Sequence, residues 1–160
     1  MEKVKESGKA RSIGVSNFLQ SHLEAISKTS KTTPSVNQIE FHPYLQHQGL
    51  VPFHKKQGIR TVSYGPLTPV TRAQGGPLDE LLSTLAKKYS VTAEQILLRW
   101  VIDIGVVPVT TSSKESRLRT YLQALKIALT PEEVDNITEI GEQKHFRVFW
   151  QNKFAAEDRS

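Results

Sequence analysis

Residues 35–41 read SVNQIEF, a short run rich in apolar and β-branched side chains with a polar residue at its start. Three similar runs lie at residues 10–16 (ARSIGVS), 59–64 (IRTVSY) and 105–110 (GVVPVT). Each has the length and composition of a buried strand, and the first three begin at nearly even intervals along the chain. The four runs therefore predict four β-strands.

Helical patterns separate these runs. Apolar side chains recur at helical spacing over residues 21–27, 48–57, 78–89, 92–102, 114–125 and 130–140. Three pairs have the spacing of a capping box: Thr92 with Gln95, Ser112 with Glu115, and Thr130 with Glu133. Strands that alternate with helices are typical of βαβ units and a parallel sheet. We expect residues 1–160 to form a single α/β domain with an irregular, aromatic-rich tail from about residue 143.

The composition excludes several classes of protein. The chain has 160 residues, 38% of them hydrophobic, and no cysteine, so disulfides and thiolate metal sites are excluded. No run approaches the roughly 18 apolar residues that cross a bilayer. The net charge is +5, but lysine and arginine are interleaved with glutamate, without the basic stripe typical of nucleic-acid binding. We therefore expect a cytoplasmic protein without membrane or nucleic-acid partners.

Four strands raise a difficulty for the packing of the sheet. Parallel strands with helices on one face usually close into a barrel only when there are eight of them. Four would leave an apolar inner face and two open edges. The fold that we predict is thus a partial (β/α)8 TIM barrel of about four parallel strands with flanking helices, which either pairs with something or is a fragment.

Ligands of βα proteins bind where the parallel strands end, and polar side chains follow the first three predicted strands. Asn17 and Gln38 can each donate and accept a hydrogen bond, which suits a ligand that is itself a carboxamide. Tyr64 offers a flat face on which a ring can stack. The alternative is that Asn17 closes a turn and Gln38 binds neighbouring backbone.

The fourth predicted strand runs into residues 110–114, TTSSK, just before a helix. The N-terminus of a helix carries free N–H groups and a partial positive charge, which favour phosphate. Lys114 and Arg117 add cations there. The alternative is that Ser112 or Ser113 only caps the helix and that the cations are ordinary surface residues.

No nucleophile with its base, paired carboxylates or metal-ligand spacing is evident, so no catalytic or metal-binding residue is predicted. Among the histidines only His42 follows a strand directly. A single histidine in that position is more often packed and hydrogen-bonded than catalytic.

Several segments resemble the aldo-keto reductase family. Residues 8–18 (GKARSIGVSNF), 36–46 (VNQIEFHPYLQ) and 58–67 (GIRTVSYGPL) are similar to its fifth, sixth and seventh barrel strands. Residues 96–118 (ILLRWVIDIGVVPVTTSSKESRL) resemble its eighth strand and phosphate loop, and residues 129–137 (LTPEEVDNI) its closing helix. The combination is similar to fungal members. The family is a (β/α)8 barrel that reduces carbonyls to alcohols with NADPH and without a metal.

The resemblance implies a role for each matching residue. Ser16, Asn17 and Gln38 would hold the nicotinamide carboxamide, and Tyr64 would stack on the nicotinamide ring. Gly65, Pro66 and Leu67 would line the pyrophosphate. Ser112 and Arg117 would bind the 2′-phosphate of the adenosine, on a cofactor-binding loop that also contains Thr111, Ser113 and Lys114. In the tail, Phe146, Phe149 and Trp150 either line the pocket for a small carbonyl substrate or only cover the barrel.

Three positions depart from the family pattern. Gly65, Thr111 and Tyr121 stand where the family commonly has Ser, Lys and Asn. The last two weaken a strict preference for NADP(H), so NAD(H) is not excluded, and Lys114 is a candidate to replace the missing charge.

The family's catalytic Asp, Tyr, Lys and His come from its first four strands and have no counterpart here. We expect no turnover from this chain alone. Its first residues read like the interior of a longer protein, as in a truncated gene product. Two further possibilities are a non-catalytic NADP-binding module and a half-barrel that self-associates through its exposed face.

Overall fold

The computed structural model of the protein describes residues 1–155 and 158–160. It contains a four-stranded sheet in the order β1 (Val15–Ser16), β2 (Val36–Glu40), β3 (Arg60–Tyr64) and β4 (Val107–Val109). All three pairings are parallel, which confirms the prediction from the strand–helix alternation. The first predicted strand is much shorter than expected, because only two of its residues pair with β2.

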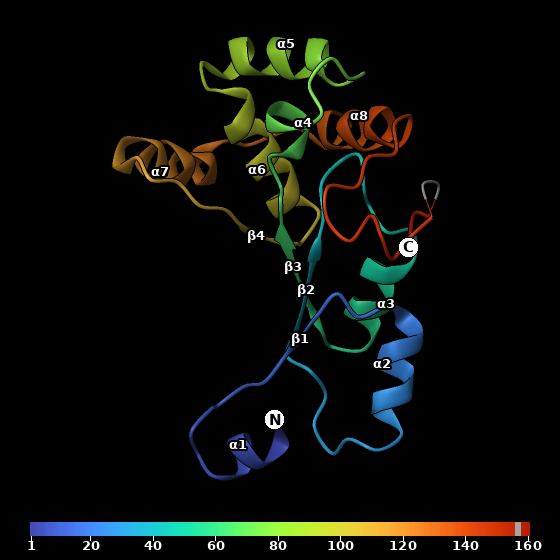
Figure 1. Ribbon diagram of the computed structural model, residues 1–160. Coiled ribbons are helices and arrows are strands. Elements are labelled where there is room, and N and C mark those ends of the chain that lie inside the picture. The colour runs from blue at the N-terminus through green and yellow to red at the C-terminus, as the bar shows by residue number, and fades with distance from the viewer. Residues whose placement is uncertain (156–157) are drawn as a thin grey trace.

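The predicted helices form close to their expected bounds, as α2 (Gln20–Ser27), α3 (Leu50–Lys56), α5 (Asp79–Tyr89), α6 (Ala93–Asp103), α7 (Glu115–Leu122) and α8 (Pro131–Glu142). Two short helices, α1 (Glu2–Glu6) and α4 (Thr68–Thr71), and a 3-10 turn, η1 (Gln123–Lys126), were not predicted. In Figure 1, α1 lies at one end of the molecule and α5 at the other, and the tail returns from α8 past the sheet toward α3.

Two of the three expected capping boxes are present. Thr92 and Gln95 cap α6, and Thr130 and Glu133 cap α8. The third prediction was wrong, because α7 begins at Glu115 with Lys114 as its N-cap. The Ser112 hydroxyl instead accepts the Lys114 N–H at 3.1 Å, which closes a local turn and places Glu115 at the start of the helix.

The hydrophobic core lies between the outer face of the sheet and the helices. Trp100 and Leu97 of α6 are completely buried, and the Trp100 ring stacks on Phe41 just after β2, with 5.7 Å between the ring centres. Leu23 of α2 and Leu82 of α5 extend this core on either side. The apolar periodicity of these helices therefore faces the sheet, as their sequences predict.

The inner face of the sheet is only partly covered. Residues that pair in register share a face, so Val62 and Val107 lie beside Gln38, and Val109 lies beside Tyr64. Val107 and Val109 are 43% and 44% exposed, although parallel strands are normally covered on both faces. The expected open inner face is present.

The apolar side of α7 and η1 is also uncovered. Leu118, Leu122 and Leu125 have helical spacing, but they are 40%, 65% and 62% exposed. They follow β4, which is an end strand of the sheet. The periodicity predicts a helix correctly, but nothing in the described part of the chain buries its apolar face.

Candidate functional site at the strand ends

Three predicted site residues meet where β1 and β3 end. The Tyr64 hydroxyl donates a hydrogen bond to Asn17 Oδ1 at 2.7 Å, and Asn17 Nδ2 donates to the Ser16 hydroxyl at 3.1 Å. Ser16 in turn donates to the carbonyl of Gln38 at 2.8 Å. The structure therefore joins Ser16, Asn17 and Tyr64 in one polar cluster, to which Gln38 contributes its backbone.

Asn17 adopts an unusual backbone conformation at this cluster. Its φ is +57°, in the left-handed region that asparagine tolerates better than most residues. Its N–H also donates to the Gln38 carbonyl at 2.9 Å. Asn17 thus closes a turn and, at the same time, presents its carboxamide to Tyr64, so the two interpretations of its role are compatible.

A buried polar network supports the loop that carries Asn17. Asn37 is fully buried on β2; its Nδ2 donates to the Phe18 carbonyl at 2.7 Å and lies 3.0 Å from His54 Nε2. His54 Nδ1 lies 2.9 Å from the Thr61 hydroxyl. Burial lowers the pKa of His54 to about 4, so the ring is neutral at physiological pH. Alternation along β2 places the Asn37 side chain on the helix-covered face, and a polar residue at such a position is the sequence signal that marks it.

Glu40 connects the sheet to the C-terminal tail. Its carboxylate is 2% exposed and accepts the N–H of Val148 at 2.7 Å and that of Phe149 at 3.0 Å. Burial acts to raise the pKa of Glu40, but the hydrogen bonds from His42 and from these two amides outweigh it and lower the pKa. Sequence analysis missed Glu40, because its partners are more than 100 residues away along the chain.

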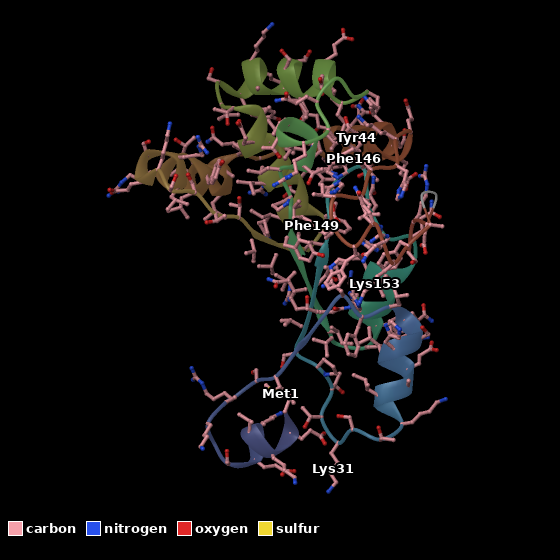
Figure 2. All side chains as sticks on the ribbon, viewed as in Figure 1. Met1, Lys31, Tyr44, Phe146, Phe149 and Lys153 are labelled. Atoms are coloured by element: carbon pink, nitrogen blue, oxygen red, sulfur yellow. The ribbon has the colours of Figure 1, made fainter. Side chains whose placement is uncertain are left out.

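Two of the three predicted tail aromatics lie at the polar cluster. The ring of Phe149 packs edge-on with that of Tyr64, at 5.4 Å between centres and 78° between planes. Trp150 borders an apolar groove of about 690 Å³ together with Ser16, Asn17 and Phe18. Phe146 lies elsewhere, beside the core near Tyr44, and the Lys144 ammonium is within 6 Å of both rings. Figure 2 shows Phe149 near the sheet and Phe146 closer to Tyr44.

The turn after β3 holds the other predicted contacts of this strand. Gly65 has a φ of +68°, which a serine would adopt only with strain, so glycine suits this backbone. Leu67 is buried in the core, and its carbonyl accepts the N–H groups of Val70 and Thr71, so its side chain is not available to a ligand.

The predicted phosphate loop is the most open part of the site. Thr111, Ser113, Lys114 and Arg117 are exposed and Ser112 is half-buried. On α7, Arg119 pairs with Glu115 at 2.6 Å, whereas no ion pair among residues 1–155 and 158–160 involves Arg117. Arg117 is thus the cation of this helix that is available to an anionic ligand. Among the described residues, no hydrogen bond or ion pair joins this loop to the Asn17–Tyr64 cluster.

His42 is a packed residue in this structure. It is completely buried, and its Nε2 lies 3.2 Å from Glu40 Oε1. Burial lowers its pKa despite the nearby carboxylate. These contacts agree with the packed interpretation rather than with a catalytic one. None of the helices in the described part of the chain is long and apolar enough to cross a membrane.

The parallel βα arrangement, with polar groups gathered at the carboxyl ends of its strands, defines part of a βα barrel, a fold whose ligands bind at that end. A family model described as "Aldo/keto reductase family" matches residues 1–142. The chain belongs to this family, which confirms the resemblance seen in its motifs.

The chain is similar to two yeast enzymes. It is 42% identical to an NADPH-dependent alpha-keto amide reductase of Saccharomyces cerevisiae, over 96% of this chain and 52% of that protein. It is also 42% identical to an NAD/NADP-dependent indole-3-acetaldehyde reductase of Schizosaccharomyces pombe, over 95% of this chain and 54% of that protein. The chain therefore spans about half the length of the curated relatives that it matches.

Solved structures show the same fold. An aldo-keto reductase of Bombyx mori in complex with NADP superposes with a TM-score of 0.80 at 35% identity, over 88% of this chain and 48% of that one. The aldo-keto reductase MGS-M4, from a deep-sea metagenome library, gives a TM-score of 0.82 at 31% identity, over 92% and 54% of the two chains. The partial TIM barrel predicted from the sequence is confirmed.

Proposed function

We propose that this chain is the cofactor-binding half of an aldo-keto reductase, which reduces small aldehydes or ketones to alcohols. The observation that carries the proposal is the Ser16–Asn17–Tyr64 cluster at the carboxyl ends of β1 and β3. When bound, NADP(H) would supply the hydride. The chain's own residues would hold it: Asn17 and Ser16 at the carboxamide, and Tyr64 against the ring.

The donor set fits such a ligand. Asn17 and Tyr64 are half-buried and hydrogen-bond each other, so a carboxamide that replaced either partner would find matched donors and acceptors. At the other end, Arg117 is exposed and can grip a phosphate with two parallel hydrogen bonds. The relatives include one protein named as NADPH-dependent and one named as NAD/NADP-dependent, so both cofactors belong in the test.

Titration calorimetry of the purified chain with NADPH and NADH tests this role. Removing a charge-assisted contact costs about 1.5–3 kcal/mol, so Arg117→Ala should weaken NADPH binding about tenfold or more and leave NADH binding unchanged. Arg119→Ala is the matched control, because that arginine is already paired with Glu115. Equal losses in the two variants, or no binding by the parent chain, would contradict the proposal.

We also propose that the chain does not turn over by itself, since no residue here matches the family's catalytic Asp, Tyr, Lys and His. NADPH oxidation should not exceed the background when aldehydes are added. Turnover that persists after rigorous removal of host reductases refutes this. A cytoplasmic location belongs to the same proposal and is checked by imaging a tagged chain.

A second candidate role is self-association through the exposed half-barrel face. It is favoured by β1 and β4 as free sheet ends and by the exposure of Val107 and Val109. If β4 of each copy paired with β1 of the other, two copies would close a ring of eight parallel strands, the usual number. Leu118 and Leu122 would then cover the outer face of the neighbouring strand.

Light scattering after size-exclusion chromatography tests this association. A dimer of the parent chain should revert to a monomer in Val109→Lys, because a charge would enter the closed inner face. Val4→Lys changes an exposed valine of α1 in the same way and should leave the dimer intact. A parent chain that is monomeric at all concentrations overturns this second role.

A further inference from the structure

Glu40 is a buried carboxylate whose hydrogen-bonding partners come from the far end of the chain. A carboxylate that is 2% exposed requires strong partners, because removing it from water is costly. Two of these are the amides of Val148 and Phe149, at 2.7 and 3.0 Å, one on each carboxylate oxygen. Because the two hydrogen bonds hold consecutive backbone amides, they fix both the position and the direction of the tail.

The other contacts leave the charge of Glu40 directed at the tail. His42 Nε2 lies 3.2 Å from Oε1, but the imidazole is fully buried and its pKa is lowered by burial, so it acts as a neutral partner. His47 contacts the backbone carbonyl of Glu40, at 2.6 Å, and not its side chain. The two tail amides therefore add charge-assisted hydrogen bonds, one on each carboxylate oxygen, to the contact with His42.

The same contacts place aromatic rings at the proposed cofactor site. Glu40 pairs in register with Tyr64, so both side chains lie on the inner face of the sheet. Phe149, held by its own amide, packs edge-on with Tyr64 at 5.4 Å between ring centres. The next residue, Trp150, borders the groove that contains Ser16 and Asn17. Figure 2 shows Phe149 beside the sheet, well away from the tail's contact at Tyr44.

We propose that Glu40 is a positioning residue of the cofactor site. Its carboxylate holds the tail so that Phe149 and Trp150 form a wall against Tyr64, and the ligand end that meets Tyr64 depends on this wall. The inference rests on the proposed function for its ligand. Among the described residues, no hydrogen bond or ion pair joins the Arg117 loop to Glu40 or to the tail, so the phosphate end of the ligand should bind independently of Glu40.

Two ligands separate these ends. NADP carries the nicotinamide, whereas adenosine 2′,5′-bisphosphate has only the adenosine and its phosphates. Glu40→Gln keeps the size of the side chain but removes its charge, and it should weaken NADP binding about threefold to tenfold, with the bisphosphate affinity unchanged. Glu139→Gln makes the same change at an exposed carboxylate of α8 and should alter neither affinity. Equal losses for both ligands in Glu40→Gln, or no loss for NADP, would overturn the proposal.

A double-mutant cycle tests whether Glu40 acts through the tail. Phe149→Leu removes the ring at a position that is 42% exposed, so it should cost the fold little. If Glu40 works by placing this ring, adding Glu40→Gln to Phe149→Leu should weaken NADP binding no further than about twofold. Losses that simply add would show that Glu40 acts by another route and would overturn the inference.

Amide hydrogen exchange distinguishes failure of this inference from failure of the proposed function. In the parent chain the Val148 and Phe149 amides should be protected, and Glu40→Gln should speed their exchange at least tenfold while the amides of α6 stay protected. This result retains the positioning role even if the chain binds neither ligand, which would refute only the proposed function. Unprotected amides in the parent chain overturn the positioning role directly.

Discussion

Mild acid should destabilise this protein through His54. The ring is fully buried and makes both of its hydrogen bonds to uncharged groups. Asn37 Nδ2 donates to Nε2 at 3.0 Å, which assigns the ring proton to Nδ1, where it faces the Thr61 hydroxyl at 2.9 Å. A proton added at Nε2 would point at the Asn37 NH₂ group and would bury a positive charge.

The size of the effect follows from the pKa. Burial lowers the pKa of His54 from 6.5 to about 4, so the folded state disfavours the charged form. Its contribution to stability is therefore complete above pH 6.5 and is lost as the pH falls from 6.5 toward 4. The loss is about 2 kcal/mol by pH 5 and about 3 kcal/mol once complete, at 1.36 kcal/mol per pKa unit.

Urea unfolding, followed by circular dichroism at pH 7.5 and pH 5, measures this loss. In His54→Gln the drop in the free energy of unfolding between the two pH values should be smaller than in the parent chain by about 2 kcal/mol. His47 is the matched comparison, because burial also lowers its pKa to about 4. His47→Gln should likewise reduce the difference in the free energy of unfolding between the two pH values, but it leaves the hydrogen bond with Asn37 intact. Parallel curves for the parent and His54→Gln would refute the reasoning.

Two further changes probe α8 and its packing. Burial acts to raise the pKa of Glu133, but hydrogen bonds from Lys88, Tyr89 and the Thr130 amide lower it to about 2, so its stabilisation is present above pH 4.5 and lost below. Between pH 5 and pH 2.5 the parent chain should therefore lose about 1–2 kcal/mol more stability than Glu133→Gln, after allowance for the exposure of Lys88. Thermal melts at the two pH values measure this difference, and an equal loss of stability in the two proteins contradicts the prediction. A Cβ on Gly141 would lie 2.6 Å from the Pro43 carbonyl oxygen, so Gly141→Ala should cost about 1–3 kcal/mol in urea unfolding, whereas Glu139→Ala on the same helix should be near neutral. If Gly141→Ala is as stable as the parent chain, the backbone at Pro43 can move aside without cost and the prediction is wrong.

Local signals in the sequence predicted the local structure well. The Thr130–Glu133 pair and the proline after Thr130 act within one turn of helix, and α8 begins there. Ser112 and Glu115 had the same spacing, but a serine two residues before an N-cap can bind that residue's amide instead, and here it does. Of the strand expected at residues 10–16, only Val15 and Ser16 pair with β2, the single neighbour of β1 in the sheet.

Long-range contacts explain what could not be predicted. No local pattern marks Glu40 as the partner of Val148, because the contact depends on how the tail returns across the sheet. The positions of Asn17 and Tyr64 could be predicted from the sequence, since the ends of parallel strands meet at one edge of a sheet. Their direct hydrogen bond depends on the left-handed conformation of Asn17, which the turn after β1 determines.

A single strand, β2, organises the site through alternate residues. Toward the helices, Asn37 holds the Phe18 carbonyl and so supports the loop that carries Asn17. The Gln38 carbonyl accepts from both Ser16 and Asn17. Toward the inner face, Glu40 binds the tail. Because these contacts lie on opposite faces, a one-residue slip of β2 would move Asn37 to the inner face and Glu40 to the helix-covered face and would separate all three parts of the site. The register of β2 therefore sets the geometry of the proposed nicotinamide contacts, whereas Arg117, whose loop shares none of these hydrogen bonds, contributes its charge independently.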